Sequence, residues 1–126
     1  MFKTLVFIAA GGAVGASLRF LSQATVYEMF GRTFPFGTLF VNVIGSFLMG
    51  FLSIFLLEKF NLGQEWHMAI LIGVLGSYTT FSTFSIETLV LFEQGDMMKA
   101  MANILASVTL CIFAVWAGAL FAKQIV

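Results

Sequence analysis

The sequence predicts an all-α integral membrane protein with four transmembrane helices in a single domain. Of its 126 residues, 60% are hydrophobic and only 10% are charged, whereas a soluble domain carries about 25% charged residues. The mean hydropathy is +1.04. Three apolar stretches carry no charge, 33–57, 66–86 and 100–122, and a fourth, 4–27, is interrupted only by Arg19. Since a helix needs roughly 20 residues to cross a bilayer, these stretches account for nearly the whole chain, 1–126.

The first predicted helix covers about residues 4–27. Gly11 and Gly15 lie four residues apart and give it a small-residue face for close contact with another helix. Arg19 lies inside this apolar stretch, where an unpaired cation is costly. Either its side chain reaches the headgroups, or it lines an electropositive vestibule that attracts anions. A cleaved signal peptide is an alternative, but this apolar run exceeds the roughly 7 to 15 residues of a signal-peptide core.

The second predicted helix covers about 36–57. Pro35, the only proline, suits its start, because the first turn of a helix does not use the missing N–H. Asn42 lies within this apolar span, and its amide offers two hydrogen-bond donors and one acceptor oxygen. Either Asn42 bonds a neighbouring helix as part of the packing, or its NH₂ group faces a permeating ion.

The third predicted helix, about 67–91, contains the most polar part of the apolar sequence, residues 75–84. Five hydroxyl side chains crowd this stretch: Ser77, Thr79, Thr80, Ser82 and Thr83. Each polar group buried without a partner costs about 2 to 7 kcal/mol, so the stretch must face protein, water or an ion. Its glycine and adjacent β-branched threonines weaken helix propensity, which predicts a helix break over 76–80. Inside a bilayer, the freed carbonyls of such a break are available to hold a cation. Glu87, near the helix end, is expected to reach the membrane interface.

The fourth predicted helix covers about 98–122. Four residues recur on one face at every fourth position, Asn103, Ser107, Cys111 and Val115, so this face begins polar and ends apolar. A serine on a helix can bond its own backbone, so Ser107 alone is weak evidence for a polar pathway. It gains weight only together with Asn42 and the hydroxyls of the third helix.

The loop charges are nearly balanced across the predicted membrane. With four spans, the N-terminus, second loop and C-terminus share one side and carry Lys3, Lys59 and Lys123. The other side carries Arg32 and Lys99, together with Arg19 if it lies near that end. The positive-inside rule then predicts almost no preference for one orientation, so the chain could insert in both orientations. The formal net charge is zero, and no nucleic-acid partner is expected.

The chemistry of the polar residues favours transport of a small anion. The sequence contains no Ser/His/Asp set, Cys/His cluster or glycine-rich phosphate loop, so an enzyme is not expected. An aromatic ring has a positive edge, and edge-on Phe81 and Phe84 can attract a small anion without a full charge that would trap it. Hydroxyl and amide donors can replace the water of such an anion. These residues therefore point to an anion that accepts strong hydrogen bonds.

The same residues resemble the Fluc/CrcB family of small dual-topology fluoride channels. The resemblance covers essentially the whole chain and rests on Gly11-Gly12 and Arg19, on 37–39 with Asn42 and Gly45, and on 76–84, which contains the signature run Thr-Thr-Phe-Ser-Thr-Phe at 79–84. It implies a fluoride-selective channel that passively exports cytoplasmic fluoride from a prokaryote across its inner (plasma) membrane. It also implies an antiparallel homodimer with two pores and a structural Na⁺ at the centre of the interface.

The resemblance also implies roles for single residues. Asn42 is the expected pore amide, and Phe81 and Phe84 are the fluoride-facing rings. The expected hydroxyl track comprises Ser82, Thr83 and Ser107. Arg19 is expected near a vestibule, and Gly76 and Thr79 are expected to offer backbone carbonyls to Na⁺. The chain departs from more polar relatives at Cys111 and Val115, which stand where hydroxyls can occur.

Two other functions remain open from the residues. A small dual-topology drug/proton antiporter has similar length and helix number, but it needs a membrane-embedded carboxylate in its first helix, and none lies in 1–27. A non-conducting structural membrane subunit would use Asn42 and the hydroxyls only to join helices. A stable monomer would favour this last alternative, because four helices of this size enclose a poor lumen.

Overall fold

The computed structural model describes all 126 residues, and nearly all of them are helical. The helices are α1 (Phe2–Phe30), α2 (Phe36–Lys59), α3 (Gln64–Met68), the π-helix η1 (Ala69–Leu75), α4 (Gly76–Tyr78), α5 (Phe81–Glu93) and α6 (Met97–Ile125). From α3 to α5 the chain forms one interrupted span, Gln64–Glu93. The four spans have mean hydropathies between 1.4 and 2.3 and are long and apolar enough to cross a membrane.

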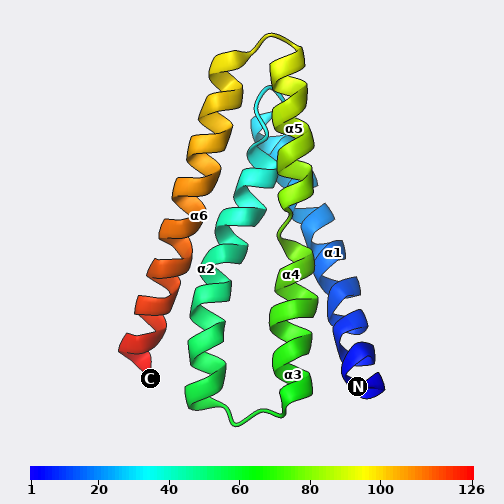
Figure 1. Ribbon diagram of the computed structural model, residues 1–126, viewed down its shortest axis with the longest axis vertical. Helices are drawn as coiled ribbons and strands as arrows, with labels where there is room; N and C mark the ends of the chain where they lie inside the picture. Colours follow the sequence, from blue (N-terminus) through cyan, green and yellow to red (C-terminus); the bar gives the residue numbers. More distant parts are fainter.

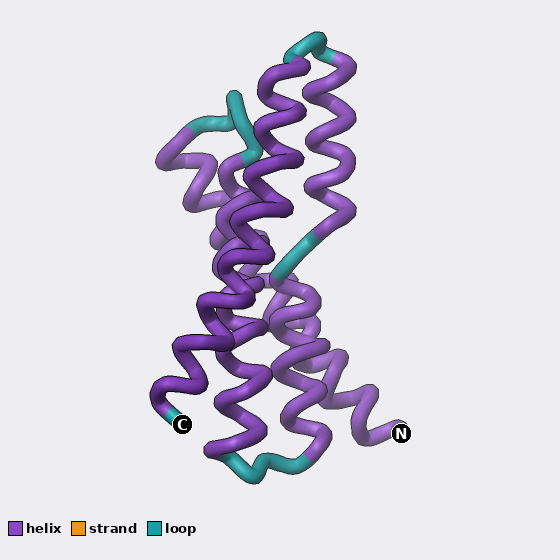
Figure 2. The backbone as a smooth tube through the Cα atoms, turned by 60° about the vertical axis from the view of Figure 1, so that its left-hand side comes forward, coloured by secondary structure: helices purple, strands orange, loops and turns teal.

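The four spans run alternately up and down (Figure 1). Both termini and the α2–α3 loop lie at one end, while the α1–α2 and α5–α6 loops lie at the other. Figure 2 shows the third span interrupted by a short non-helical segment near its middle. The predicted all-helical fold with a broken third helix is therefore confirmed.

The helices extend further than the apolar stretches from which their bounds were predicted. For example, α1 continues to Phe30 and ends only where Gly31 adopts a φ of 80°. The N–H of Gly31 donates a hydrogen bond to the carbonyl oxygen of Tyr27 at 2.9 Å. Glycine adopts this left-handed conformation without steric cost, so it is a common helix terminator. The apolar run thus marks the membrane core, whereas the turn residue marks the helix end.

The break in the third span is shorter than predicted. Gly76–Tyr78 forms a helical turn, and only Thr79 and Thr80 leave the helical conformation, with ψ angles of 156° and 115°. Tyr78 is 9% exposed, and its hydroxyl donates to Ser22 Oγ on α1 at 3.1 Å, which anchors the turn. A tertiary contact thus outweighs the weak helix propensity of glycine, which costs only about 1 kcal/mol.

Glycines let the backbones of neighbouring spans touch. A Cβ at Gly11 would overlap the carbonyl oxygen of Ala69, and a Cβ at Gly15 would overlap that of Val74. The predicted small-residue face of the first helix is therefore confirmed, with η1 as its partner. The backbones of α2 and α6 also approach closely at a glycine, Gly50, where a Cβ would overlap the backbone of α6. Close backbone approach through small residues is typical of membrane helices.

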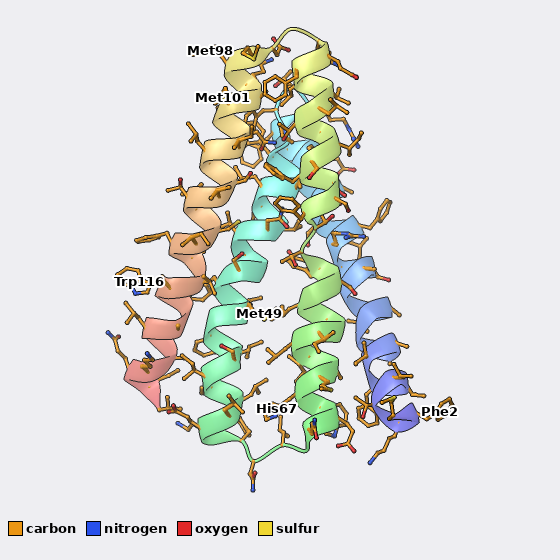
Figure 3. All side chains as sticks on the ribbon, in the orientation of Figure 1. Phe2, Met49, His67, Met98, Met101 and Trp116 are labelled. Carbon is orange, nitrogen blue, oxygen red and sulfur yellow. The ribbon has the colours of Figure 1, made fainter.

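Many large apolar side chains lie on the outside of the bundle. Phe2 and Trp116 point away from it (Figure 3) and are 81% and 57% exposed. Lipid tails or another apolar surface can cover such side chains at no cost in free energy, because the bilayer interior is itself apolar.

Candidate ion pathway

A groove with a volume of about 500 Å³ lies between α2, the helix break, α5 and α6. We call it the central groove. Its polar and aromatic lining comes mainly from Asn42, Thr79, Thr80, Phe81, Phe84 and Ser107. Apolar side chains from α2 and α6 complete it, including Met49, which projects from α2 (Figure 3). The fold thus brings together residues from three spans that the sequence predicts to share one pathway.

Asn42 pairs with the backbone at the break. Its Oδ1 accepts a hydrogen bond from Thr80 N at 2.7 Å, and its Nδ2 donates to Thr80 O at 2.9 Å. This side chain therefore joins α2 to the third span, as the packing alternative predicted. It also lines the central groove, and Nδ2 carries a second hydrogen that has no partner within the chain. Asn42 thus retains one donor that is available to the groove.

The hydroxyl of Thr80 restarts the helix. Thr80 Oγ1 accepts from Thr83 N at 3.2 Å, which is the bond of an N-cap, and donates to Thr83 Oγ1 at 3.0 Å. Ser82 Oγ lies 3.4 Å from the same oxygen. Neither Ser82 nor Thr83 lines the central groove of the single chain. Their hydroxyls gather around the cap of α5, and Ser82 remains exposed.

Phe81 and Phe84 form an aromatic pair at the groove. Their ring centroids are 5.3 Å apart, and the ring planes meet at 50°. Phe84 is buried at 8% exposure, whereas Phe81 is 75% exposed. Phe81 therefore marks the open side of the groove, where a single chain leaves an aromatic ring uncovered.

Ser107 is the polar contribution of α6. It lines the groove and is 7% exposed, and its Oγ donates to Asn103 Oδ1 at 3.3 Å. One and two turns further along α6, Cys111 and Val115 also line the groove. The α6 wall is thus polar only at one end, as the sequence pattern predicts.

At the break, the carbonyls of Gly76 and Thr79 lack the donors that a continuous helix would supply, because Thr83 N bonds Thr80 Oγ1 and not Thr79 O. Thr79 N bonds Leu75 O instead, and Thr80 N bonds the side chain of Asn42. Carbonyl oxygens left unpaired at membrane depth are costly unless they line a cavity or hold an ion. Unwound carbonyls are typical ligands of Na⁺ in membrane proteins. The oxygens of Gly76 and Thr79 therefore fit a hard monovalent cation.

A second polar cluster lies nearer the end that carries the α1–α2 loop. Thr38 is at its centre and is 2% exposed. Its Oγ1 donates to Glu87 Oε1 at 2.7 Å and accepts from Gln23 Nε2 at 3.0 Å. The Tyr27 hydroxyl lies 3.4 Å from the same oxygen. Glu87 Oε2 is buried without a partner. Thr38 therefore holds the carboxyl of Glu87 against α2, and the expectation that Glu87 reaches the membrane interface stays a prediction. Polar residues within three apolar spans were the signal that could have revealed this cluster.

Glu87 also lines a second cavity of about 280 Å³ together with Tyr27, Arg32 and Gln94. The guanidinium carbon of Arg32 lies 4.8 Å from the centre of the Tyr27 ring, within the range of a cation–π contact. Arg19 lines neither this cavity nor the central groove. It is half-exposed on α1, so its vestibule position stays a prediction.

The chain is similar in sequence to known proteins over most of its length. Residues 6–119 match the family described as "CrcB-like protein, Camphor Resistance (CrcB)". A protein of Shewanella amazonensis named "Fluoride-specific ion channel FluC" is 50% identical over 92% of this chain and 93% of that protein. A protein of the same name from Geobacter sulfurreducens is 48% identical over 97% of this chain and 98% of its own length.

A longer relative carries the same name. In the Methylococcus capsulatus protein, 55% of residues are identical over 99% of this chain, which spans only 55% of that protein's length. The family match covers all four spans and includes Asn42, Phe81, Phe84 and Ser107. The chain therefore belongs to the CrcB family.

Proposed function

We propose that this chain forms a fluoride-selective channel that passively exports cytoplasmic fluoride. The observation that carries the proposal is the lining of the central groove, where an amide donor, hydroxyls and two phenylalanine rings meet at a helix break. No carboxylate lines this groove. Such a wall can replace the hydration of a small anion without a full charge that would trap it. The names of the bacterial relatives support the same ion.

A second copy of the chain completes each pore in this proposal. The 75% exposure of Phe81 and the open groove support it, because one chain leaves the aromatic wall uncovered. The near-balanced loop charges support insertion in both orientations, and hence an antiparallel homodimer with two pores. The cell inner membrane of a prokaryote is the proposed location.

A structural Na⁺ at the centre of the dimer is also proposed. The unpaired carbonyls of Gly76 and Thr79 support it, and Gly76 is exposed on the single chain. In an antiparallel pair, each chain would present its own break toward the partner. The ion would supply positive charge at the interface, while these residues would contribute only backbone oxygens.

The proposed transport is driven by the membrane potential. Neutral HF enters from acidic surroundings and dissociates in the cytoplasm, where the fluoride anion is trapped. Moving one elementary charge across 100 mV is worth about 2.3 kcal/mol, so an inside-negative potential can drive fluoride out through an open pore. In this scheme Asn42 and the hydroxyls orient donors toward the anion, and the phenylalanine edges guide it past the break.

Fluoride efflux from liposomes tests the proposal. Liposomes loaded with KF and holding the purified protein are diluted into fluoride-free buffer, valinomycin releases the compensating K⁺, and an electrode records fluoride. We expect rapid fluoride release and negligible chloride release from a matched KCl-loaded sample. Absence of fluoride release from a folded, reconstituted dimer would overturn the proposal. Drug uptake driven by a proton gradient would instead support the antiporter.

A further inference from the structure

A chain of hydrogen bonds runs from the central groove into the α5–α6 contact. Ser107 Oγ donates to Asn103 Oδ1 at 3.3 Å, Asn103 Nδ2 donates to Thr88 Oγ1 at 2.9 Å, and Thr88 donates to Phe84 O at 2.7 Å. Asn103 is 1% exposed, and Ser107 and Thr88 are each 7% exposed. Only Ser107 of these three side chains lines the groove.

The direction of these bonds decides what Ser107 offers to an ion. A serine hydroxyl has one hydrogen and two lone pairs. Because Asn103 Oδ1 takes that hydrogen, Ser107 presents only lone pairs to the groove. Lone pairs repel an anion, so in this arrangement Ser107 cannot act as a donor in an anion pathway.

The same side chains can also be linked by hydrogen bonds that run in the opposite direction. If the Asn103 amide turns over, Nδ2 donates to Ser107, and Oδ1 accepts from Thr88. The carbonyl of Phe84 then loses the Thr88 hydroxyl but keeps its position in the helix ladder of α5, where Thr88 N is the i+4 donor. Ser107 now points its hydrogen into the groove. The reversed direction has two bonds within the chain in place of three, and an anion that accepts the free hydrogen of Ser107 supplies the third.

We propose that Asn103 is the positioning residue that decides whether the hydroxyl of Ser107 directs its hydrogen or a lone pair into the central groove. A fluoride ion beside Ser107 selects the direction in which Asn103 donates, and the departing ion lets the chain return. Asn103 never touches the ion and acts only through Ser107. This inference rests on the proposed function, because it concerns an anion in the groove.

A double-mutant cycle in the liposome efflux assay tests the inference. Asn103→Leu removes both polar atoms at similar volume, and Ser107 then turns its hydrogen to its own helix backbone. We expect a roughly three- to tenfold loss of fluoride efflux, which corresponds to the loss of one hydrogen bond. In the Ser107→Ala background, Asn103→Leu should cause little further change. Thr109→Val, which removes an exposed hydroxyl from α6 outside the groove, is the matched control.

The outcomes separate a positioning role from a structural one. Equal losses from Asn103→Leu in both backgrounds, or no loss in either, would overturn the inference. Should Asn103→Leu not assemble, Thr88→Val changes the far end of the chain, and its effect should likewise vanish beside Ser107→Ala. The unaltered protein is measured in parallel, and its failure to pass fluoride would refute the proposed function instead.

Discussion

The side-chain amide of Asn42 pairs with the peptide group of Thr80 through two hydrogen bonds, from Thr80 N to Oδ1 at 2.7 Å and from Nδ2 to Thr80 O at 2.9 Å. This pairing supplies partners to the backbone N–H and carbonyl of Thr80 at the break. Because Thr80 directly precedes Phe81, the pairing also sets where α5 begins relative to α2. The helix break and the groove therefore share one residue.

Asn42→Ala should abolish fluoride flux. It removes the free amide hydrogen from the groove and leaves Thr80 without partners at two backbone atoms. Each unsatisfied group costs about 1 to 3 kcal/mol, so thermal stability in detergent should also fall. In size-exclusion chromatography the variant should elute at the same volume as the unaltered protein. The matched control is Asn61→Ala in the exposed α2–α3 loop, which should leave flux unchanged.

Phe81→Ile should abolish fluoride flux with little effect on stability. The substitution removes the ring edge at the open side of the groove, but Phe81 is 75% exposed in the single chain and supports little of its packing. Phe20→Ile, at a similarly exposed position on α1, is the control and should conduct normally. Normal efflux through the Phe81 variant would remove this ring from the pathway.

Gly45→Ala should impair flux, and Thr79→Ser should partly restore it. A Cβ at Gly45 would overlap the Cγ2 methyl of Thr79, which pushes the break away from α2. Serine lacks that methyl but keeps the hydroxyl that bonds Leu75 O at 3.1 Å. Thr79→Ser alone should conduct normally, since any Na⁺ site there uses backbone oxygen. Efflux rates of the two single variants and the double variant check this. A double variant that loses as much efflux as Gly45→Ala alone would contradict the contact.

Thr38→Val should lower the free energy of unfolding by about 1 to 3 kcal/mol. Valine has nearly the same shape but removes the oxygen that contacts Gln23, Tyr27 and Glu87. The buried carboxyl of Glu87 would then lose its hydroxyl partner. Thermal unfolding in detergent measures the change. Thr25→Val, whose exposed hydroxyl bonds only its own helix at 2.9 Å, should be close to neutral.

Local chemistry made much of the candidate site predictable. Asn42 and the hydroxyl-rich 75–84 stretch are conspicuous because polar groups are rare in apolar spans. The partners of these groups were not predictable, since a hydroxyl bonds equally well to its own helix, another helix or an ion. Thus Thr83 serves the cap of α5, and Glu87 is held by Thr38 from another span.

The number of spans, their order and the weak point of the third helix follow from the residues alone, because apolar length and helix propensity are properties of local residues. The narrowing of the break to Thr79 and Thr80, and the pairing of Asn42 with it, depend on contacts between helices. The hydrogen-bond chain that links Ser107 and Asn103 to Thr88 likewise forms only where α5 and α6 meet. These outcomes depend on which helix faces meet, and that is set by the close contacts of glycines distant in the chain.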